Sequence, residues 1–288
     1  MANLKEIRNR IASVSSTMQI TSAMKMVSAA KLKKAQDAIT AMRPYSQKLT
    51  ELLQNLSATL EGDTGGAFAE QRPVNKVLIV AITSNRGLCG AFNTNIIKQV
   101  KNLQDVVYAG KQVEVLAIGK KGNDVLKKLS NVVENKSSLY DALTFENTAH
   151  IAQSLMGRFT AGEYDKIELV YNHFKNAGTQ VVITEQFLPL VPPQAGKESN
   201  TELDYIFEPS KEEIVLSLIP LSLKTQLYKA VRDSFASEHG ARMTAMHKAT
   251  DNATALRNQL KLTYNKARQA AITGEILEIV GGAEALNS

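Results

Sequence analysis

The chain has 288 residues, enough for about two domains, and its composition is 44% hydrophobic but only 6% aromatic, with no tryptophan. So few aromatic side chains disfavour a fold built on one thick core. The formal net charge is +6, and the longest apolar run is Val77–Ile82. Because a membrane-spanning helix needs about 20 apolar residues, the sequence excludes a transmembrane helix.

The first residues lack the apolar stretch of a secretory signal, and Glu6 argues against a transit peptide. Cys89 is the only cysteine, which excludes a disulfide within the chain and is typical of a reducing compartment. We therefore expect a cytoplasmic protein, held at a membrane surface only through partners.

Both ends of the chain are predicted to be long helices that pair with each other. No glycine precedes Gly62, and residues 241–273 contain neither glycine nor proline. Apolar residues recur three and four positions apart in the N-terminal segment at Leu4, Ile7, Ile11, Val14 and Met18, and again at Met42, Tyr45, Leu49, Leu52 and Leu56. Small and apolar residues do so in the C-terminal segment at Leu256, Leu260, Thr263, Ala267, Ala270, Gly274 and Leu277. This heptad spacing predicts an antiparallel coiled coil, although the N-terminal pattern drifts between residues 20 and 34.

The two predicted helices differ in length. The first is expected from about residue 2 to 60, with a kink rather than an end at Pro44. The second is expected from about residue 211 to 285, with Ser210 as its N-cap. At 1.5 Å per residue the lengths are about 87 and 112 Å, so the second helix should extend past the first by roughly fifteen residues. That tip, Glu275 to Ser288, contains no Lys or Arg.

The centre of the chain alternates between strand and helix patterns, and 12 of the 16 glycines lie between Gly62 and Gly196. The predicted strands cover 77–83, 113–118, 167–174 and 179–188. The predicted helices cover 93–103, a segment ending near residue 129, and 145–159. This order is typical of a small α/β domain with a mostly parallel sheet and one antiparallel hairpin. The predicted division of the chain is 1–60, 74–193, a linker at 194–209, and 210–288.

Positive charge is concentrated on the two predicted helices. Residues 1–50 carry nine Lys and Arg against two Asp and Glu. A second basic band, from Arg242 to Arg268, contains Asp251 as its only acidic residue. Such a surface is attracted to an acidic partner, but a solvated helix face explains it equally well.

The residues that could carry chemistry form no convincing site. The loop Gly87–Gly90 lies where a phosphate-binding loop would, but neither GxGxxG nor GxxxxGK[ST] is present, and a structural turn is favoured. Cys89 could act as a nucleophile with His150 or His173, but a packed thiol is favoured. His239 and His247 lack metal-ligand spacing. No catalytic residue, cofactor or metal is predicted.

Four stretches resemble one family, the gamma subunit of F-type ATP synthase. They are Ile20–Val27, Ser84–Asn93, Tyr264–Ala270 and Ile272–Ala285, in the family's order. The resemblance covers essentially the whole chain. Two departures stand out: Asn85 occupies a position where many relatives have Asp, and the paired-cysteine insertion of chloroplast members is absent.

The resemblance implies a central rotor shaft that couples proton flow through a membrane ring to sequential changes at three catalytic beta subunits. Expected partners are the alpha, beta and epsilon subunits and the proton-carrying ring, on the cytoplasmic face of a bacterial inner membrane. Contacts with the beta subunits are expected at Met24, Arg242, Arg268, Gln269, Thr273 and Glu275. Contacts with epsilon and the ring are expected at Tyr205 and Glu208.

Two other functions remain open from the residues alone. A basic coiled coil could bind nucleic acid, although no aromatic residues interleave with its charges. An α/β enzyme could use a nucleotide at the loop Gly87–Gly90.

Overall fold

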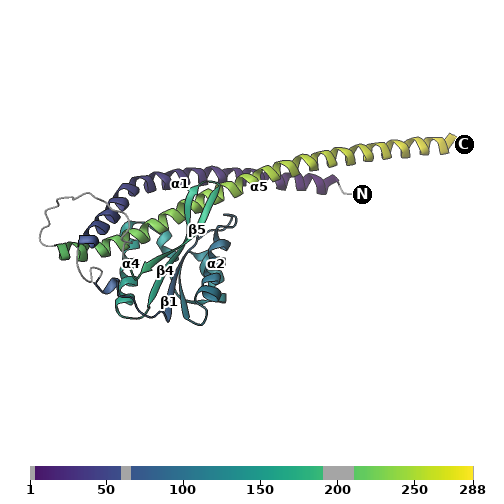
Figure 1. The fold of residues 1–288 in the computed structure, drawn as a ribbon. Coiled ribbons are helices and arrows are strands. Elements are labelled where there is room, and N and C mark those ends of the chain that lie inside the picture. The colour runs from purple at the N-terminus through teal and green to yellow at the C-terminus, as the bar shows by residue number, and fades with distance from the viewer. Residues whose placement is uncertain (1–3, 60–65, 191–210, 288) are drawn as a thin grey trace. The chain divides into compact units, whose positions relative to one another are not determined.

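The computed structural model describes residues 4–59, 66–190 and 211–287 (Figure 1). The chain divides into two compact units. The first combines Met1–Ser28 with Met243–Ser288, and the second is Ala29–Arg242. Neither long helix is confined to one unit, so each unit is described in turn. The predicted division at 1–60, 74–193, 194–209 and 210–288 stays a prediction.

The two predicted long helices are confirmed. Helix α1 is Leu4–Thr59 and continues through Pro44, and helix α5 is Lys211–Asn287 and contains Pro220. The predicted cap at Ser210 lies outside the described residues. Within the described ranges, no helix is both long and apolar enough to cross a membrane.

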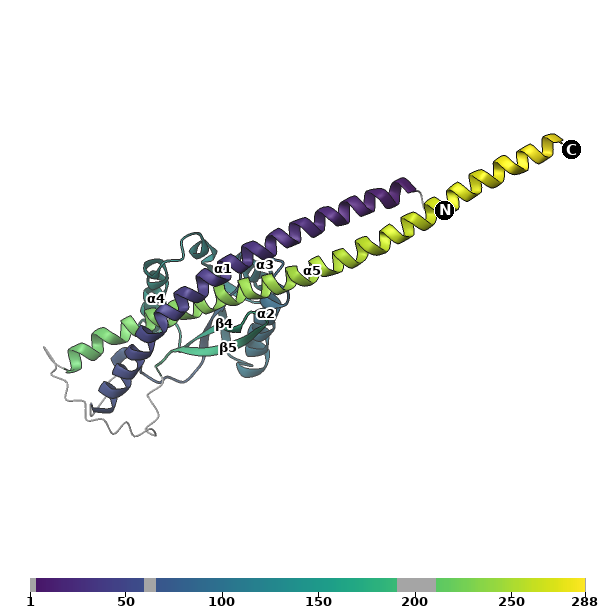
Figure 2. The same ribbon diagram turned by 90° about the horizontal axis from the view of Figure 1, so that it is seen from above.

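In the first unit, the two chain ends run antiparallel. Three contacts fix the register: Arg8 Nη2 to Tyr264 Oη at 2.9 Å, Met18 Sδ to Thr254 Oγ1 at 3.3 Å, and Thr21 Oγ1 to Thr250 Oγ1 at 2.8 Å. Residue numbers rise along α1 as they fall along α5, which defines an antiparallel pair (Figure 2). By this register Leu4 lies opposite residue 268, so residues 269–287 of α5 extend past the described start of α1.

The seam between these helices is partly as predicted. Ile7 is buried, and Ile11, Val14 and Met18 are half-buried, as expected. In α5, however, Leu256 and Leu277 are 46% and 66% exposed, so these predictions are wrong. Thr263 and Ala270 are exposed as well, whereas Leu260, Ala267 and Gly274 are half-buried as expected. The half-buried positions that were not predicted are Thr254, Arg257, Tyr264 and Ala271.

The drift predicted in the middle of α1 is also wrong, because polar residues continue its seam. Thr21 and Ser28 are buried where the three-four spacing requires, and Lys25 between them is half-buried. An apolar pattern could not reveal a seam whose members hydrogen-bond.

The second unit is built on a five-stranded sheet in the order β3-β2-β1-β4-β5. The strands are β1 Lys76–Ile82, β2 Gln112–Ile118, β3 Asn131–Asn135, β4 Lys166–Asn176 and β5 Thr179–Leu188. Strands β1 to β4 pair in parallel, whereas β4 and β5 form an antiparallel hairpin. The predicted mostly parallel sheet is confirmed.

Helices cover both faces of this sheet. Helix α2 (Phe92–Asn102) and helix α3 (Lys120–Leu129) pack on one face through Ile96, Val100 and Leu126. Helix α4 (Phe145–Thr160) and the 211–242 part of α5 pack on the other, where Leu155, Leu223 and Leu227 are buried. The described residues also contain three short helical segments, η1 Gly66–Phe68, η2 Leu103–Val107 and η3 Ser137–Asp141.

Strand β3 was not predicted. It is an edge strand of five residues, with Val132 and Glu134 half-buried and its other residues exposed. Two asparagines bound it, and asparagine is depleted in strands. Its pairing with β2 therefore came from tertiary structure rather than local preference.

Two buried carboxylates brace the sheet across β1. The Tyr108 hydroxyl, from the segment before β2, donates to Glu168 on β4 at 2.6 Å. The Tyr164 hydroxyl, from the segment before β4, donates to Glu114 on β2 at 2.6 Å. The two tyrosines belong to the cores on opposite faces of the sheet. The Tyr108 bond therefore ties the segment before β2 to β4, and the Tyr164 bond ties the segment before β4 to β2. Both bonds span β1, which lies between β2 and β4.

Replacing Tyr108 or Tyr164 with Phe should lower the free energy of unfolding by about 1–3 kcal/mol, because a buried carboxylate loses one of its donors. Chemical denaturation of the full chain measures this, and Tyr45→Phe, at an exposed tyrosine, is the control. Burial, followed by the neighbouring carboxylate, raises the pKa of both tyrosines. Their stabilisation is therefore complete below pH about 10 and is lost as pH rises further. Equal alkaline sensitivity in wild type and both variants would contradict this.

Candidate partner-contact sites

The loop between β1 and α2, residues 83–91, is held by hydrogen bonds with α2 and α5. Leu88 has a φ of 62°, a left-handed conformation that is unusual for a residue with a side chain, and Gly90 has a φ of 59°. The Ser84 amide donates to Asn93 Oδ1 at 3.0 Å, which ties the start of the loop to α2. Such a conformation persists only where its surroundings hold it.

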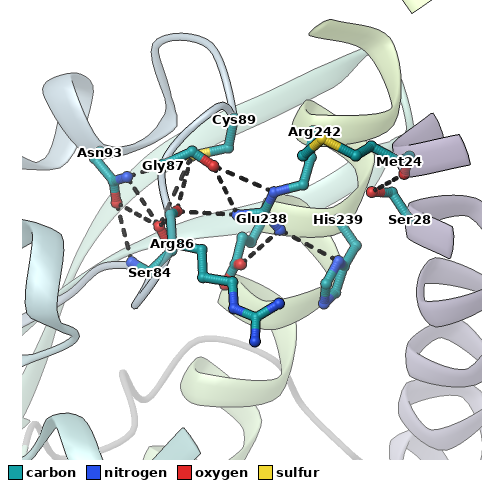
Figure 3. A network of polar contacts seen from close by, with 10 residues as sticks. All are labelled: Met24, Ser28, Ser84, Arg86, Gly87, Cys89, Asn93, Glu238, His239 and Arg242. Carbon is teal, nitrogen blue, oxygen red and sulfur yellow. Dashed lines mark hydrogen bonds and ion pairs between the residues drawn. The ribbon is translucent and has the colours of Figure 1, made fainter. Parts of the chain in front are cut away.

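Arg242 on α5 provides that constraint (Figure 3). Its Nη2 donates to the carbonyl oxygen of Arg86 at 3.0 Å, and its Nε donates to that of Gly87 at 3.3 Å. Its Nη1 forms an ion pair with Glu238, one turn earlier, at 2.7 Å. Arg242 is 6% exposed. The guanidinium predicted to contact a partner is thus engaged within the chain, as a latch between α5 and the loop.

His239 lies beside this latch. Its ring packs edge-on against Phe235, and its Nε2 is buried without a hydrogen-bond partner. Burial lowers the pKa of His239 to about 4, with smaller contributions from the positive charges of Arg242 and Lys31. Burial also raises the pKa of the Glu238 carboxyl, against the opposing effect of Arg242. His239 is therefore neutral in the folded chain at neutral pH.

Cys89 is packed in the same loop, as predicted. It is 2% exposed, and its Sγ accepts from Asn93 Nδ2 at 3.3 Å. Burial raises the pKa of the thiol. His173 pairs with Asp233 at 2.7 Å, and His150 is exposed on α4. The described contacts therefore favour a structural thiol over a nucleophile.

The start of α3, beside this loop, has its amides occupied by the chain itself. The amides of Lys120, Lys121 and Gly122 donate to Asn85 Oδ1, the Ser84 carbonyl and Thr83 Oγ1 at 2.9–3.0 Å. A Cβ at Gly122 would lie 2.4 Å from Thr83 Oγ1. Phosphate binding at a helix start needs amides that are free to donate, so this end of the sheet favours the structural interpretation. Among the described residues, no group of three His, Cys, Asp or Glu side chains is placed to hold a metal.

Asn85 needs both ends of its amide. Its Oδ1 accepts from the Lys120 amide, and its Nδ2 donates to the Ser137 carbonyl at 3.0 Å. An ionised aspartate could not donate. In this chain, position 85 therefore uses both the acceptor and the donor of an amide side chain.

The remaining candidates lie on the helix pair. Arg268, Gln269, Thr273 and Glu275 are exposed on α5, where it reaches and passes the described start of α1. Met24, on α1, is half-buried and by the register lies opposite residues near 248, well away from that group. Tyr205 and Glu208 lie outside the described residues.

Sequence reasoning missed three contacts that fix the register of the helix pair. Arg8 with Tyr264, Thr21 with Thr250, and Met18 with Thr254 join residues at least 229 positions apart. The only signal for them in the sequence is the spacing of three and four residues, and it becomes visible only when polar residues are counted as seam positions.

The fold resembles chains of known ATP synthase rotors. A central-stalk structure of the Tetrahymena thermophila mitochondrial ATP synthase matches with a TM-score of 0.58 and 28% identity, covering 80% of this chain and 99% of that one. A rotor structure of the Euglena gracilis mitochondrial enzyme matches with a TM-score of 0.66 and 22% identity, over 93% and 98%. The architecture is that of a central-stalk protein.

The sequence comparisons identify the family. The ATP synthase family model matches residues 3–286. The chain is 78% identical to the ATP synthase gamma chain of Flavobacterium psychrophilum over 286 residues, 99% of both chains. It is 53% identical to that of Cytophaga hutchinsonii over 295 aligned positions, all of both chains. The chain belongs to the ATP synthase gamma chain family.

Arg242→Lys should free the loop, because a lysine can keep the ion pair with Glu238 but cannot also reach both carbonyls. We expect Cys89, the only thiol, to react about 10–100 times faster with a thiol reagent, as hydrogen bonds from a charged group are lost. Arg232→Lys, on the same helix but bonded to Tyr228, is the matched control. An unchanged labelling rate would show that the latch does not hold the loop.

His239 should make the chain less stable in acid. Its folded pKa of about 4 lies below the unfolded value of about 6.5, so its contribution is complete above pH about 6.5 and is lost as pH falls toward 4. We expect the loss to be about 2–3 kcal/mol smaller in His239→Gln, measured by denaturation at each pH. Glu238 is present in both chains, so its own titration largely cancels. Parallel pH profiles would contradict the assignment.

Proposed function

We propose that this gamma chain is the central rotor shaft of an F-type ATP synthase, coupling proton flow through a membrane ring to sequential changes at three catalytic sites. The observation that carries this proposal is the antiparallel pairing of the two chain ends, with residues 269–287 of α5 extending past the described start of α1. A paired, asymmetric helical segment can present a different side to each of three surrounding subunits as it turns. Family membership over residues 3–286 supports the same role.

We propose that the chain itself is not catalytic. In many doubly wound α/β proteins, ligands bind at the carboxyl ends of the parallel strands. Here the loop after β1 is held by Arg242, and the amides at the start of α3 donate to Thr83, Ser84 and Asn85. The polar groups that would bind a nucleotide therefore support the domain instead. Nucleotide chemistry would belong to partner subunits.

We propose that Arg268 and Gln269 contact a loop of a beta subunit, with Thr273 and Glu275 beside them. All four side chains are exposed in the free chain, so a partner can reach them. The tip is free of Lys and Arg and carries Glu275, Glu278 and Glu284, so it is acidic. Met24 would contact the partners at a different position along the helix pair. Arg242 would act indirectly, by holding the loop Arg86–Cys89 in place.

The proposed partners are alpha and beta subunits around the helix pair, and an epsilon subunit and the proton-carrying ring near Tyr205 and Glu208. The Tetrahymena thermophila structure contains a central stalk with a c-ring, which supports a ring partner for this chain. Relatives such as the Flavobacterium psychrophilum protein are bacterial. This supports a peripheral location on the cytoplasmic face of a bacterial inner membrane.

Replacing Arg268 and Gln269 together with Ala should reduce ATP synthesis by the assembled complex several-fold, because a charged contact made during rotation is lost. The chain should remain folded, since exposed substitutions usually change stability by less than about 0.5 kcal/mol. Proton-driven ATP synthesis in membrane vesicles and the thermal midpoint of the purified chain measure the two effects. Asn258 and Gln259, exposed on the same helix, provide the control double variant. Normal synthesis in the Arg268/Gln269 variant would remove these residues from the contact.

A further inference from the structure

Met18 of α1 lies in the seam of the first unit and faces two donors on α5. Its Sδ is 3.5 Å from Arg257 Nη1 and 3.3 Å from Thr254 Oγ1. The Thr254 hydroxyl has a single proton, which it also directs at the Thr250 carbonyl oxygen at 2.9 Å. Arg257 is therefore the main donor to the sulfur. A thioether is only a weak acceptor.

Arg257 is poorly satisfied by this arrangement. The residue is half-buried, and its Nε is buried without a hydrogen-bond partner. Among the described residues, no carboxylate forms an ion pair with Arg257, and its hydrogen bond to Met18 is to a neutral sulfur. A desolvated guanidinium gains much more from an oxygen acceptor than from a thioether. The site thus holds donors in excess of acceptors.

We propose that Met18 is a site of oxidation by peroxides, and that Arg257 and Thr254 hold the resulting sulfoxide. In the reaction, the lone pair of Sδ attacks one oxygen of hydrogen peroxide and forms the S–O bond while the O–O bond breaks. The proton on the transferred oxygen moves to the departing hydroxide, which leaves as water. The sulfur loses two electrons, and the peroxide gains them.

The oxidised form is the better partner for α5. A sulfoxide oxygen is a strong acceptor, and it forms within reach of donors that are already in place. Methionine oxidation usually disrupts a packed interface because it makes an apolar side chain polar. At Met18 oxidation should instead stabilise the interface, because the new oxygen supplies the acceptor that Arg257 lacks. The helix pair of residues 4–28 and 243–287 should become more resistant to local opening.

The other described methionines lack this combination. Met26 is 64% exposed, so peroxide can reach it, but it has no described hydrogen-bond donor. Met156 and Met246 are only 1% and 5% exposed, so peroxide has little access to them. Met24, Met42 and Met243 are half-buried like Met18, but no described donor contacts their sulfur atoms. Met18 is half-buried, so its sulfur combines partial access with built-in donors. This inference concerns the chain alone and does not depend on its role as a rotor.

The test uses full-length chain in which Met24, Met26, Met42 and Met243 are replaced by Leu, so that Met18 is the main oxidisable side chain in the helix pair. The chain is treated with hydrogen peroxide, and peptide mass spectrometry locates the added oxygen. Amide hydrogen exchange is then compared for segments 14–24 and 250–260 before and after oxidation. We expect oxygen at Met18 and exchange slowed roughly fivefold, the size of one net hydrogen bond.

Two variants separate this site from a general effect of oxidation. In Arg257→Leu, which suits an apolar seam, oxidation of Met18 should accelerate exchange in the same segments, as for an ordinary buried methionine. In Met18→Leu, peroxide should leave exchange unchanged. The proposal is overturned if Met18 takes up no oxygen, if its oxidation accelerates exchange with Arg257 present, or if Arg257→Leu leaves the response unaltered. None of these outcomes bears on the proposed rotor function, whose measure is ATP synthesis.

Discussion

The first unit depends on one constraint, the burial of a shared seam by two segments that lie at opposite ends of the chain. The Thr21–Thr250 contact joins residues 229 positions apart, so nothing local brings them together. Apolar positions such as Ile7 drive association, but they would fit several registers. The polar pairs Arg8–Tyr264 and Thr21–Thr250 match in only one. The seam therefore combines non-specific burial with a few contacts that select a single alignment.

Helix α5 packs against different partners along its length. Its 211–242 part buries Leu223 and Leu227 against the sheet, whereas its later part has residues of α1 as its described partners. Arg242 is the last residue of the second unit. At that end of the unit, its guanidinium forms an ion pair with Glu238 and hydrogen bonds to the loop carbonyls, so the contact is polar. One continuous helix thus serves two kinds of packing.

The α/β unit illustrates how a fold associated with ligand binding can serve as support. The loop after β1 and the start of α3 are where a phosphate could be cradled. Thr83, Ser84 and Asn85 instead satisfy the amides of α3, and Cys89, within the loop, is buried. The same backbone geometry that elsewhere faces a ligand here faces the protein's own side chains. Function is argued from the site and not from the fold alone.

The sequence by itself determined the long helices, four of the five strands and the parallel sheet, because glycine placement and hydrophobic periodicity are local signals. It also determined the family, through motifs such as Ser84–Asn93. It did not determine β3, whose short edge pairs only once β2 is in place. Nor did it reveal Arg257 and Tyr264 as seam residues or Arg242 as an internal latch. In a sequence, a polar side chain that is buried against the protein looks the same as one that faces solvent. The partners of these side chains lie far away along the chain, so only the tertiary structure decided which charges face the protein and which face solvent.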